Sequence, residues 1–208
     1  MRSKTKENLI GELVKNGYLK TPVIIEAFQK IDRKDFIREE TMAEAYGNYP
    51  LPIGRGQTIS QPLTVAFMLE LLEPKAGEKI LDVGAGSGWQ TALLAQIVGE
   101  SGKIIAIERI PELKIFAEEN IAKYEHLKNT QIILSDGSQG HELEMPYDKI
   151  VAAATANEIP LTWKEQLKIG GRIVAPVGQS IFVLDKTGQN QFSQKQFFGF
   201  SFVPLIKE

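Results

Sequence analysis

The sequence predicts an α/β fold built on a mostly parallel, doubly wound β-sheet, and three observations support this prediction. Short apolar runs alternate along most of the chain with segments whose apolar residues have helical spacing, which is typical of parallel sheets with right-handed crossovers. A glycine-rich segment directly follows one of these runs, at the place where such folds bind ligands. The last two apolar runs have no helical segment between them and indicate antiparallel strands at one edge.

Two short helices are expected near the N-terminus. Apolar residues lie at helical spacing over residues 9–14, and Gly17 is a suitable stop. Thr21 and Pro22 are typical of a helix start, and the apolar spacing continues to Ile31. We expect both helices to pack against the sheet or over a ligand, with binding of a partner protein as the alternative.

Residues 45–62 are rich in glycine, proline and small polar residues, yet they also contain tyrosine, leucine and isoleucine side chains that favour burial. We interpret them as a long ordered loop rather than a linker, and such loops are often functional. The loop leads through Ser60 into an expected helix that includes Leu71. Hydroxyls and free backbone amides should therefore gather at a positive helix end and form an anion site. The alternative is that Ser60 only caps the helix.

Residues 80–90 are expected to form a buried strand, a tight turn and the start of a helix. Gly84, Gly86 and Gly88 make the pattern G-x-G-x-G, and glycine both accepts positive φ and lets another molecule approach the backbone. Dinucleotide-binding folds instead use G-x-G-x-x-G to hold a pyrophosphate. Asp82 would repel a pyrophosphate but would suit the ammonium and sulfonium of S-adenosylmethionine.

Two further acids follow expected strands. Glu108 ends the apolar run 104–108 and is placed to bind ribose hydroxyls. Asp136 follows the run 132–134 and is either a contact for an adenine amine or a simple turn residue. The glycine loop, Asp82 and Glu108 together favour S-adenosylmethionine over a dinucleotide. The remaining alternative is a glycine turn that binds no ligand, with the carboxylates of Asp82 and Glu108 satisfied by hydrogen bonds within the protein.

The rest of the chain continues the alternation of helices and strands. Helices are expected over 91–98, from Pro111 to Tyr124 and over 161–167, and strands over 147–154, 172–177, 181–184 and 198–206. His126 and His141 are the only histidines, and because neither has a ligand-spaced partner, no metal site is expected.

Composition narrows the function classes. The 208 residues are 43% hydrophobic, which is enough for one domain with a full core. With a net charge of −2 the chain has no positive electrostatic field that would attract a phosphate backbone, so nucleic acid is not expected as the main partner. The lack of cysteine excludes a disulfide framework and a thiolate nucleophile. Residues 1–7 lack an apolar signal core, and no apolar run reaches the ~18 residues of a membrane span, so a soluble cytoplasmic protein is expected.

The most specific motif of the chain is Pro-Ile-Gly-Arg-Gly-Gln-Thr-Ile-Ser-Gln-Pro at 52–62. On this motif the sequence resembles the protein-L-isoaspartate O-methyltransferases, and the resemblance extends over almost the whole chain. The family commonly has threonine at the place of Ala85 and tyrosine at that of Trp89, which should tune the cofactor pocket. The segment 178–202 is short for the family. Matching segments also lie at 82–91, 107–109, 135–137, 170–172 and 202–205.

The resemblance implies a Rossmann-like S-adenosylmethionine-dependent methyltransferase fold in one domain, 1–208. Within it, 1–62 would hold the N-terminal helices and the active-site loop, 63–178 the cofactor-binding core and 179–208 the C-terminal strands. It also implies a monomer that methylates the α-carboxylate of L-isoaspartyl residues in damaged proteins. The products would be a methyl ester and S-adenosylhomocysteine. Because a carboxylate is already ionised at pH 7, positioning and removal of water would suffice without a general base.

The implied site residues fall into three groups. Ser60 is catalytic, because its hydroxyl would fix one oxygen of the substrate. Substrate contacts would come from Ile53, Gln57 and Val203. The cofactor would be held by Thr58, Ile59, Asp82, Gly84, Gly86, Ser87, Gly88, Gln90, Glu108, Arg109, Asp136 and Gly137.

Two other functions stay open. One is a methyltransferase for another acceptor, such as a small acid or an RNA base. Methylation of base amino groups usually comes with an Asn/Asp-Pro-Pro-aromatic motif after the fourth strand, where this chain has Ala-Thr-Ala-Asn at 154–157. The other is a noncatalytic module that binds S-adenosylmethionine or a protein partner.

Overall fold

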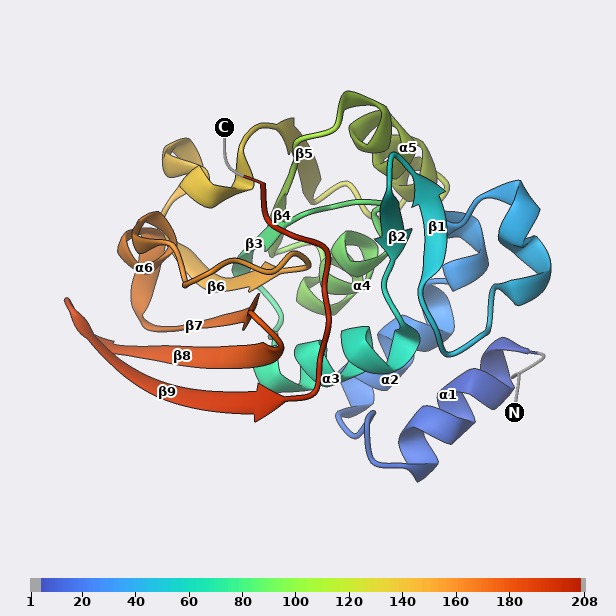
Figure 1. Cartoon of the computed structure of the whole chain (residues 1–208), viewed down its shortest axis with the longest axis horizontal. Coiled ribbons are helices and arrows are strands. Elements are labelled where there is room, and N and C mark those ends of the chain that lie inside the picture. Colours follow the sequence, from blue (N-terminus) through green and yellow to red (C-terminus); the bar gives the residue numbers. More distant parts are fainter. Residues whose placement is uncertain (1–4, 207–208) are drawn as a thin grey trace.

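The computed structural model describes residues 5–206 and has a seven-stranded sheet at its centre (Figure 1). The strand order is β5–β4–β3–β6–β7–β8–β9. Strands β3 to β7 run parallel, and β8 and β9 run antiparallel at one edge. This arrangement confirms the predicted α/β class and its antiparallel edge. Residues 1–4, which belong to the segment expected to lack a signal core, lie outside the described range.

The elements have the following bounds. The strands are β1 Leu51–Gly54, β2 Gln57–Ile59, β3 Lys79–Val83, β4 Lys103–Glu108, β5 Thr130–Leu134, β6 Tyr147–Ala152, β7 Leu167–Val177, β8 Ser180–Gly188 and β9 Gln191–Phe198. The helices are α1 Lys6–Lys15, α2 Pro22–Lys30, α3 Pro62–Leu72, α4 Trp89–Val98, α5 Pro111–Ala122 and α6 Leu161–Gln166. Short 3-10 helices are η1 Arg33–Phe36, η2 Glu39–Glu44, η3 Gly137–Gln139 and η4 Glu142–Glu144.

The two faces of the sheet bury different helices. In β3, Ile80 faces the side that carries α1 to α5, whereas Leu81 and Val83 face the side that carries α6, as alternation along a strand requires. Helix α4 is apolar nearly all round because it lies between the sheet, α2 and α5. None of the helices in the described residues is long and apolar enough to cross a membrane.

The order of the strands fixes where a ligand can bind. From β3 the chain moves outward to β4 and β5, and it then crosses to the other side of β3 to form β6. The crossovers therefore diverge at β3, and in open α/β sheets ligands bind at such a switch point, beyond the carboxyl ends of the strands. This leaves the ends of β3, β4 and β6 as the expected site.

The structure corrects the description of residues 45–62 as one long loop. They contain the connection that follows η2 and an antiparallel hairpin made of β1 and β2. The turn of this hairpin is formed by residues 54–56, in which Gly54, Arg55 and Gly56 have φ of 98°, 55° and 72°. Glycine accepts such angles readily, which explains two of the three residues at the tip, whereas Arg55 adopts a left-handed conformation that is uncommon for residues with a Cβ. The two strands are too short to show a clear alternation of apolar and polar residues, so they could not be identified from the sequence.

The expected final strand at 198–206 is wrong. Strand β9 instead covers Gln191–Phe198 and pairs with β8, so the polar residues 185–196 form most of a hairpin rather than a loop. A hairpin at the edge of a sheet can expose one face to solvent and therefore accepts polar residues. The spacing of apolar residues could not reveal it. Residues 199–206, called the strap below, leave the sheet and pass over the end of β6 (Figure 1). Strand β7 also begins earlier than expected, at Leu167.

Candidate functional site

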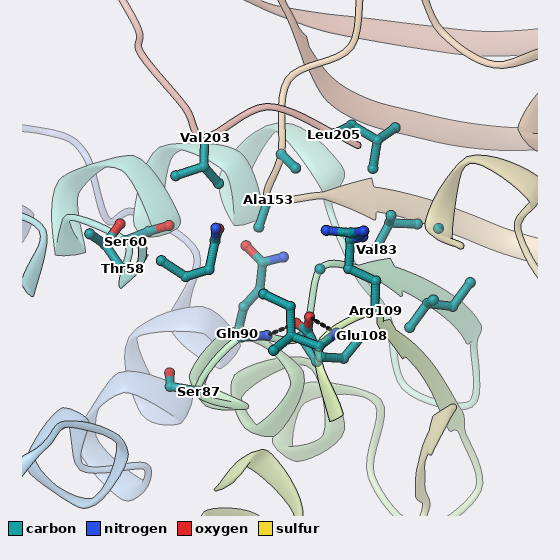
Figure 2. A pocket seen from close by; sticks show the side chains of 18 of the residues that line it. Thr58, Ser60, Val83, Ser87, Gln90, Glu108, Arg109, Ala153, Val203 and Leu205 are labelled. Atoms are coloured by element: carbon teal, nitrogen blue, oxygen red, sulfur yellow. Dashed lines mark hydrogen bonds between the residues drawn. The ribbon is translucent and has the colours of Figure 1, made fainter. Parts of the chain in front are cut away.

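A pocket with about 930 Å³ of space, partly open to solvent, lies at the carboxyl ends of β3, β4 and β6. Figure 2 shows Thr58 and Ser60 on one side of it, Glu108 and Arg109 on the other, and Val203 and Leu205 of the strap above. The sequence-predicted residues that line it are Gln57, Thr58, Ile59, Ser60, Gly84, Gly86, Ser87, Gln90, Glu108, Arg109, Gly137 and Val203.

The three glycines after β3 serve two purposes. Gly84 and Gly86 line the pocket with φ of 89° and 56°, and the Gly84 amide donates to the carbonyl of Ile107 at 2.8 Å, which ties the loop to β4. Gly88 does not line the pocket. A Cβ added there would lie 3.1 Å from the carbonyl oxygen of Ala117, so this glycine lets the start of α4 approach α5. Only the first two therefore leave room for a ligand.

Glu108 connects the glycine loop to the end of β4. Its Oε2 accepts a hydrogen bond from the amide of Gly86 at 2.8 Å, and its Oε1 accepts one from the amide of Ile110 at 2.9 Å. The side chain lines the pocket although the residue is buried. Each carboxylate oxygen has two acceptor sites, so both oxygens can also accept bonds from ligand hydroxyls.

Asp82 is fully buried and does not line the pocket. Its carboxylate accepts hydrogen bonds from Gln90 Nε2 and from Thr91 Oγ1, both at 2.7 Å. Burial raises the pKa of Asp82 to about 6, although the bonds from Thr91 and Gln90 act in the opposite direction. The expected direct contact with a cationic ligand is therefore not what this geometry favours, because strand alternation turns Asp82 toward α4. It orients Gln90, which does line the pocket.

Two other expected site residues also lie outside the pocket lining. Ile53 is completely buried, and its Cδ1 would lie 3.5 Å from a Cβ added to Gly86, so it packs beneath the glycine loop. Asp136 accepts hydrogen bonds from the amide and the hydroxyl of Ser138, at 2.8 and 2.9 Å, and thereby caps η3. This geometry matches the turn role that the sequence left open for Asp136.

Ser60 is half-buried at the edge of the pocket, and it is not the cap of α3. The N-cap of α3 is Gln61, and the Ser60 hydroxyl has no hydrogen-bond partner among residues 5–206. One of the backbone amides expected to be free there, that of Leu63, donates instead to Asn48 Oδ1 at 3.0 Å. The hydroxyl of Ser60 is therefore available to a ligand.

A second groove adjoins the first pocket at Ser60. It runs between the start of α3 and the beginning of the strap. Both cavities are lined by Thr58 and Ser60, so the two meet at these residues. The groove is lined by Pro50, Thr58, Ser60, Gln61, Leu63, Thr64 and residues 199–202.

Sequence reasoning missed several lining residues, most of them apolar. Val83 and Ile107 lie at the ends of β3 and β4, and their position could have identified them. Leu205 and Ile206 were missed because the resemblance assigned only Val203 of the strap to the site. Neither histidine lines the pocket, and the described residues contain no group of side chains that could hold a metal ion.

Comparison with known proteins identifies the family. The model of the protein-L-isoaspartate(D-aspartate) O-methyltransferase family matches residues 4–208. The chain belongs to this family. Its relatives include the protein-L-isoaspartate O-methyltransferase of Methanopyrus kandleri, 42% identical over 99% of this chain and 92% of the relative. Another, protein-L-isoaspartate O-methyltransferase 2 of Archaeoglobus fulgidus, is 46% identical over 89% of this chain and 85% of the relative.

A solved structure gives the same assignment. A Plasmodium falciparum protein of the protein-L-isoaspartate O-methyltransferase family, in complex with S-adenosyl-L-homocysteine, has a TM-score of 0.88 at 25% identity. The match covers 99% of this chain and 100% of that one. The Rossmann-like methyltransferase fold predicted for this chain is thereby confirmed.

Proposed function

We propose that this chain transfers the methyl group of S-adenosylmethionine to the α-carboxylate of L-isoaspartyl residues in damaged proteins, giving a methyl ester and S-adenosylhomocysteine. One observation carries the proposal: the pocket of the glycine loop and the groove beside the strap meet at Thr58 and Ser60. The first cavity would hold the methyl donor and the second the acceptor peptide. Membership of the family and the names of its relatives support the same reaction.

The residues of the pocket fit the cofactor. Gly84 and Gly86 expose backbone to the cavity, and Glu108 keeps acceptor sites for the two ribose hydroxyls. Because Gln90 Nε2 is bonded to Asp82, its Oε1 is directed to accept from a cationic group such as an ammonium. When bound, S-adenosylmethionine supplies an electrophilic methyl group on its sulfonium.

The acceptor side requires positioning rather than base catalysis. The pKa of an unperturbed carboxyl group is ~4, so the acceptor is ionised at neutral pH. The Ser60 hydroxyl would donate a hydrogen bond to one of its oxygens and leave the other directed at the methyl group. The strap and Thr58 would keep water from the reacting oxygen. A covalent step at Ser60 lacks support, since neither histidine lines the pocket to serve as its base.

The experiment that tests the function is transfer of labelled methyl groups to four acceptors. These are an isoaspartyl peptide, the same peptide with normal aspartate, a structured RNA and a small dicarboxylate. We expect base-labile label on the isoaspartyl peptide alone. Label on RNA or on the small acid would assign another acceptor, and binding of S-adenosylhomocysteine without any transfer would assign a noncatalytic module.

A further inference from the structure

Arg33 is the least exposed cation of the described residues, at 2% of its surface. It opens η1, and within residues 5–206 no carboxylate lies within ion-pair distance of its guanidinium. Burial lowers the pKa of Arg33 to about 10, so the side chain stays charged at neutral pH. Burying an unpaired charge is costly unless its donors are well used. The partners of this arginine therefore indicate what it does.

The guanidinium donates four hydrogen bonds, all to backbone carbonyl oxygens. Nη1 donates to Ala45 at 2.8 Å and to Gly47 at 3.1 Å. Nη2 donates to Tyr49 at 2.9 Å and to Ser60 at 3.2 Å. Carbonyls of an irregular segment have no ladder partner, and the planar fork of arginine can serve several of them at once.

These four carbonyls lie on both sides of the hairpin. Residues 45–49 precede β1, and Ser60 follows β2, so Arg33 joins the two ends of the segment that carries the hairpin. A second link exists at the same base, where Gln61 Nε2 donates to the carbonyl of Asn48 at 2.9 Å. The hairpin is thereby held as one unit beside the pocket.

Arg33 also contacts the cofactor side of the site. Its Cζ lies 5.5 Å from the ring centroid of Trp89, within the range of a cation–π contact, and Trp89 lines the pocket. The ring of Trp89 packs edge-on against Phe28, which fixes it from the other side. The arginine therefore connects the start of α4 with the loop that ends at Ser60.

We propose that Arg33 is a positioning residue for methyl transfer: by holding the Ser60 carbonyl, it directs the Ser60 hydroxyl to the junction of the two cavities. The hydroxyl itself has no partner among the described residues, so its place at the junction depends on the backbone that carries it, and Arg33 holds that backbone through the Ser60 carbonyl. This inference rests on the proposed function and on the role of Ser60 in it.

The test is a double-mutant cycle between Arg33→Lys and Ser60→Ala, measured as kcat/KM for the isoaspartyl peptide. Lysine keeps the charge but cannot serve four carbonyls. We expect Arg33→Lys to lower kcat/KM about tenfold with Ser60 present and less than about twofold in the Ser60→Ala background, because residues that act together are not additive. The Kd of S-adenosylhomocysteine should change less than about threefold, since the glycine loop is intact.

Arg172→Met is the matched control. Arg172 is a partly buried arginine that donates to the carbonyl of Leu71, at the opposite end of α3 from Ser60. Its loss should lower the melting temperature without changing kcat/KM. If Arg33→Lys does not fold, Arg33→Gln, which keeps a planar donor, takes its place in the cycle.

The outcomes separate the two proposals. Equal losses from Arg33→Lys in both Ser60 backgrounds would overturn the positioning role, as would a tenfold loss in S-adenosylhomocysteine affinity that accounts for the whole effect. Unchanged kcat/KM in Ser60→Ala alone would instead contradict the role of Ser60, and absence of transfer by the unmodified chain would contradict the proposed function.

Discussion

Glu108 uses its two carboxylate oxygens to hold two backbone amides of the pocket lining, from Gly86 at the glycine loop and Ile110 after β4. The acid that the sequence marked as a ribose ligand therefore also organises the loop that surrounds the ligand. Asp82 differs, because its carboxylate is turned away from the pocket and satisfied by α4. At the residue scale, two acids at neighbouring strand ends thus have distinct expected roles.

Replacing Glu108 with alanine should weaken binding of S-adenosylhomocysteine ten- to a hundredfold, which corresponds to about 1.5–3 kcal/mol. The variant loses the acceptors proposed for the ribose hydroxyls and the anchor of the Gly86 amide. Glutamine should recover only part of the affinity, because its NH₂ group would face a backbone N–H. Isothermal calorimetry measures each Kd, and an unchanged value in the alanine variant would leave Glu108 with a purely structural role.

Gly86→Val should abolish cofactor binding, since a branched side chain resists a φ of 56° and would occupy the pocket. The control is Gly170→Val, at an exposed position of β7 with a φ of 84° and open space around its Cβ. Both variants strain the backbone, but only the first should lose affinity for S-adenosylhomocysteine. Equal affinities in calorimetry would remove the glycine loop from the site.

Asp82 should make stability depend on pH. Its pKa is about 6 in the folded protein and ~4 when unfolded, so folding favours the protonated acid. The resulting stabilisation is complete below pH ~4 and is lost as the pH rises through about 6. Relative to Asp82→Asn, the free energy of unfolding should fall by an amount on the order of 2 kcal/mol between these limits. Urea titrations that give parallel pH profiles for the two proteins would contradict this.

At the scale of elements, the central strands and helices could be predicted because each has a clear apolar period and a capping or breaking residue. Pro22 and Pro111, for example, open α2 and α5 as expected. The β1–β2 hairpin could not, since its strands are too short to alternate visibly. The strap could not either, because an apolar run reads as a strand when its tertiary environment is unknown.

The candidate site was predictable to a similar degree. Positions along the chain identified the glycine loop, Glu108 and the segment around Ser60, all of which reach the pocket. The direction in which Asp82 points and the burial of Ile53 depend on packing against α4 and the glycine loop, which a single sequence does not encode locally. No sequence pattern identifies Arg33. Its partners are four backbone carbonyls, three of them in residues 45–49 and the fourth at Ser60, and any residue type can supply a carbonyl.

The strap should contribute to cofactor binding as an element. It is held over the pocket by two hydrogen bonds, from the Thr155 amide to the Val203 carbonyl at 2.8 Å and from the Leu205 amide to the Thr155 carbonyl at 2.7 Å. Truncation after Phe202 removes these bonds and the upper wall of the pocket. We expect S-adenosylhomocysteine affinity to fall at least about tenfold. Full affinity in a folded truncated protein would show that the wall is dispensable.

In the whole molecule, the proposed methyl-donor pocket at the end of the parallel sheet adjoins the proposed acceptor groove, which is formed by the start of α3 and the strap. Segments distant in sequence, 57–60, 84–90, 108–110 and 203–206, converge there. The division into residues 1–62, 63–178 and 179–208 within one domain stays a prediction, and so does the monomeric state. Neither is needed for the two cavities to meet at Ser60.

The most direct test of this account is the initial rate of methyl transfer to an isoaspartyl peptide by the unmodified chain and by Ser60→Ala, with the Kd of S-adenosylhomocysteine measured for both. Losing one hydrogen bond to an ionised acceptor costs ~1.5–3 kcal/mol, so kcat/KM should fall ten- to a hundredfold while the Kd changes little. Ser60→Thr, which keeps the hydroxyl, should retain partial activity. Full activity in the alanine variant would contradict the account, and loss of S-adenosylhomocysteine binding would move Ser60 into the cofactor pocket.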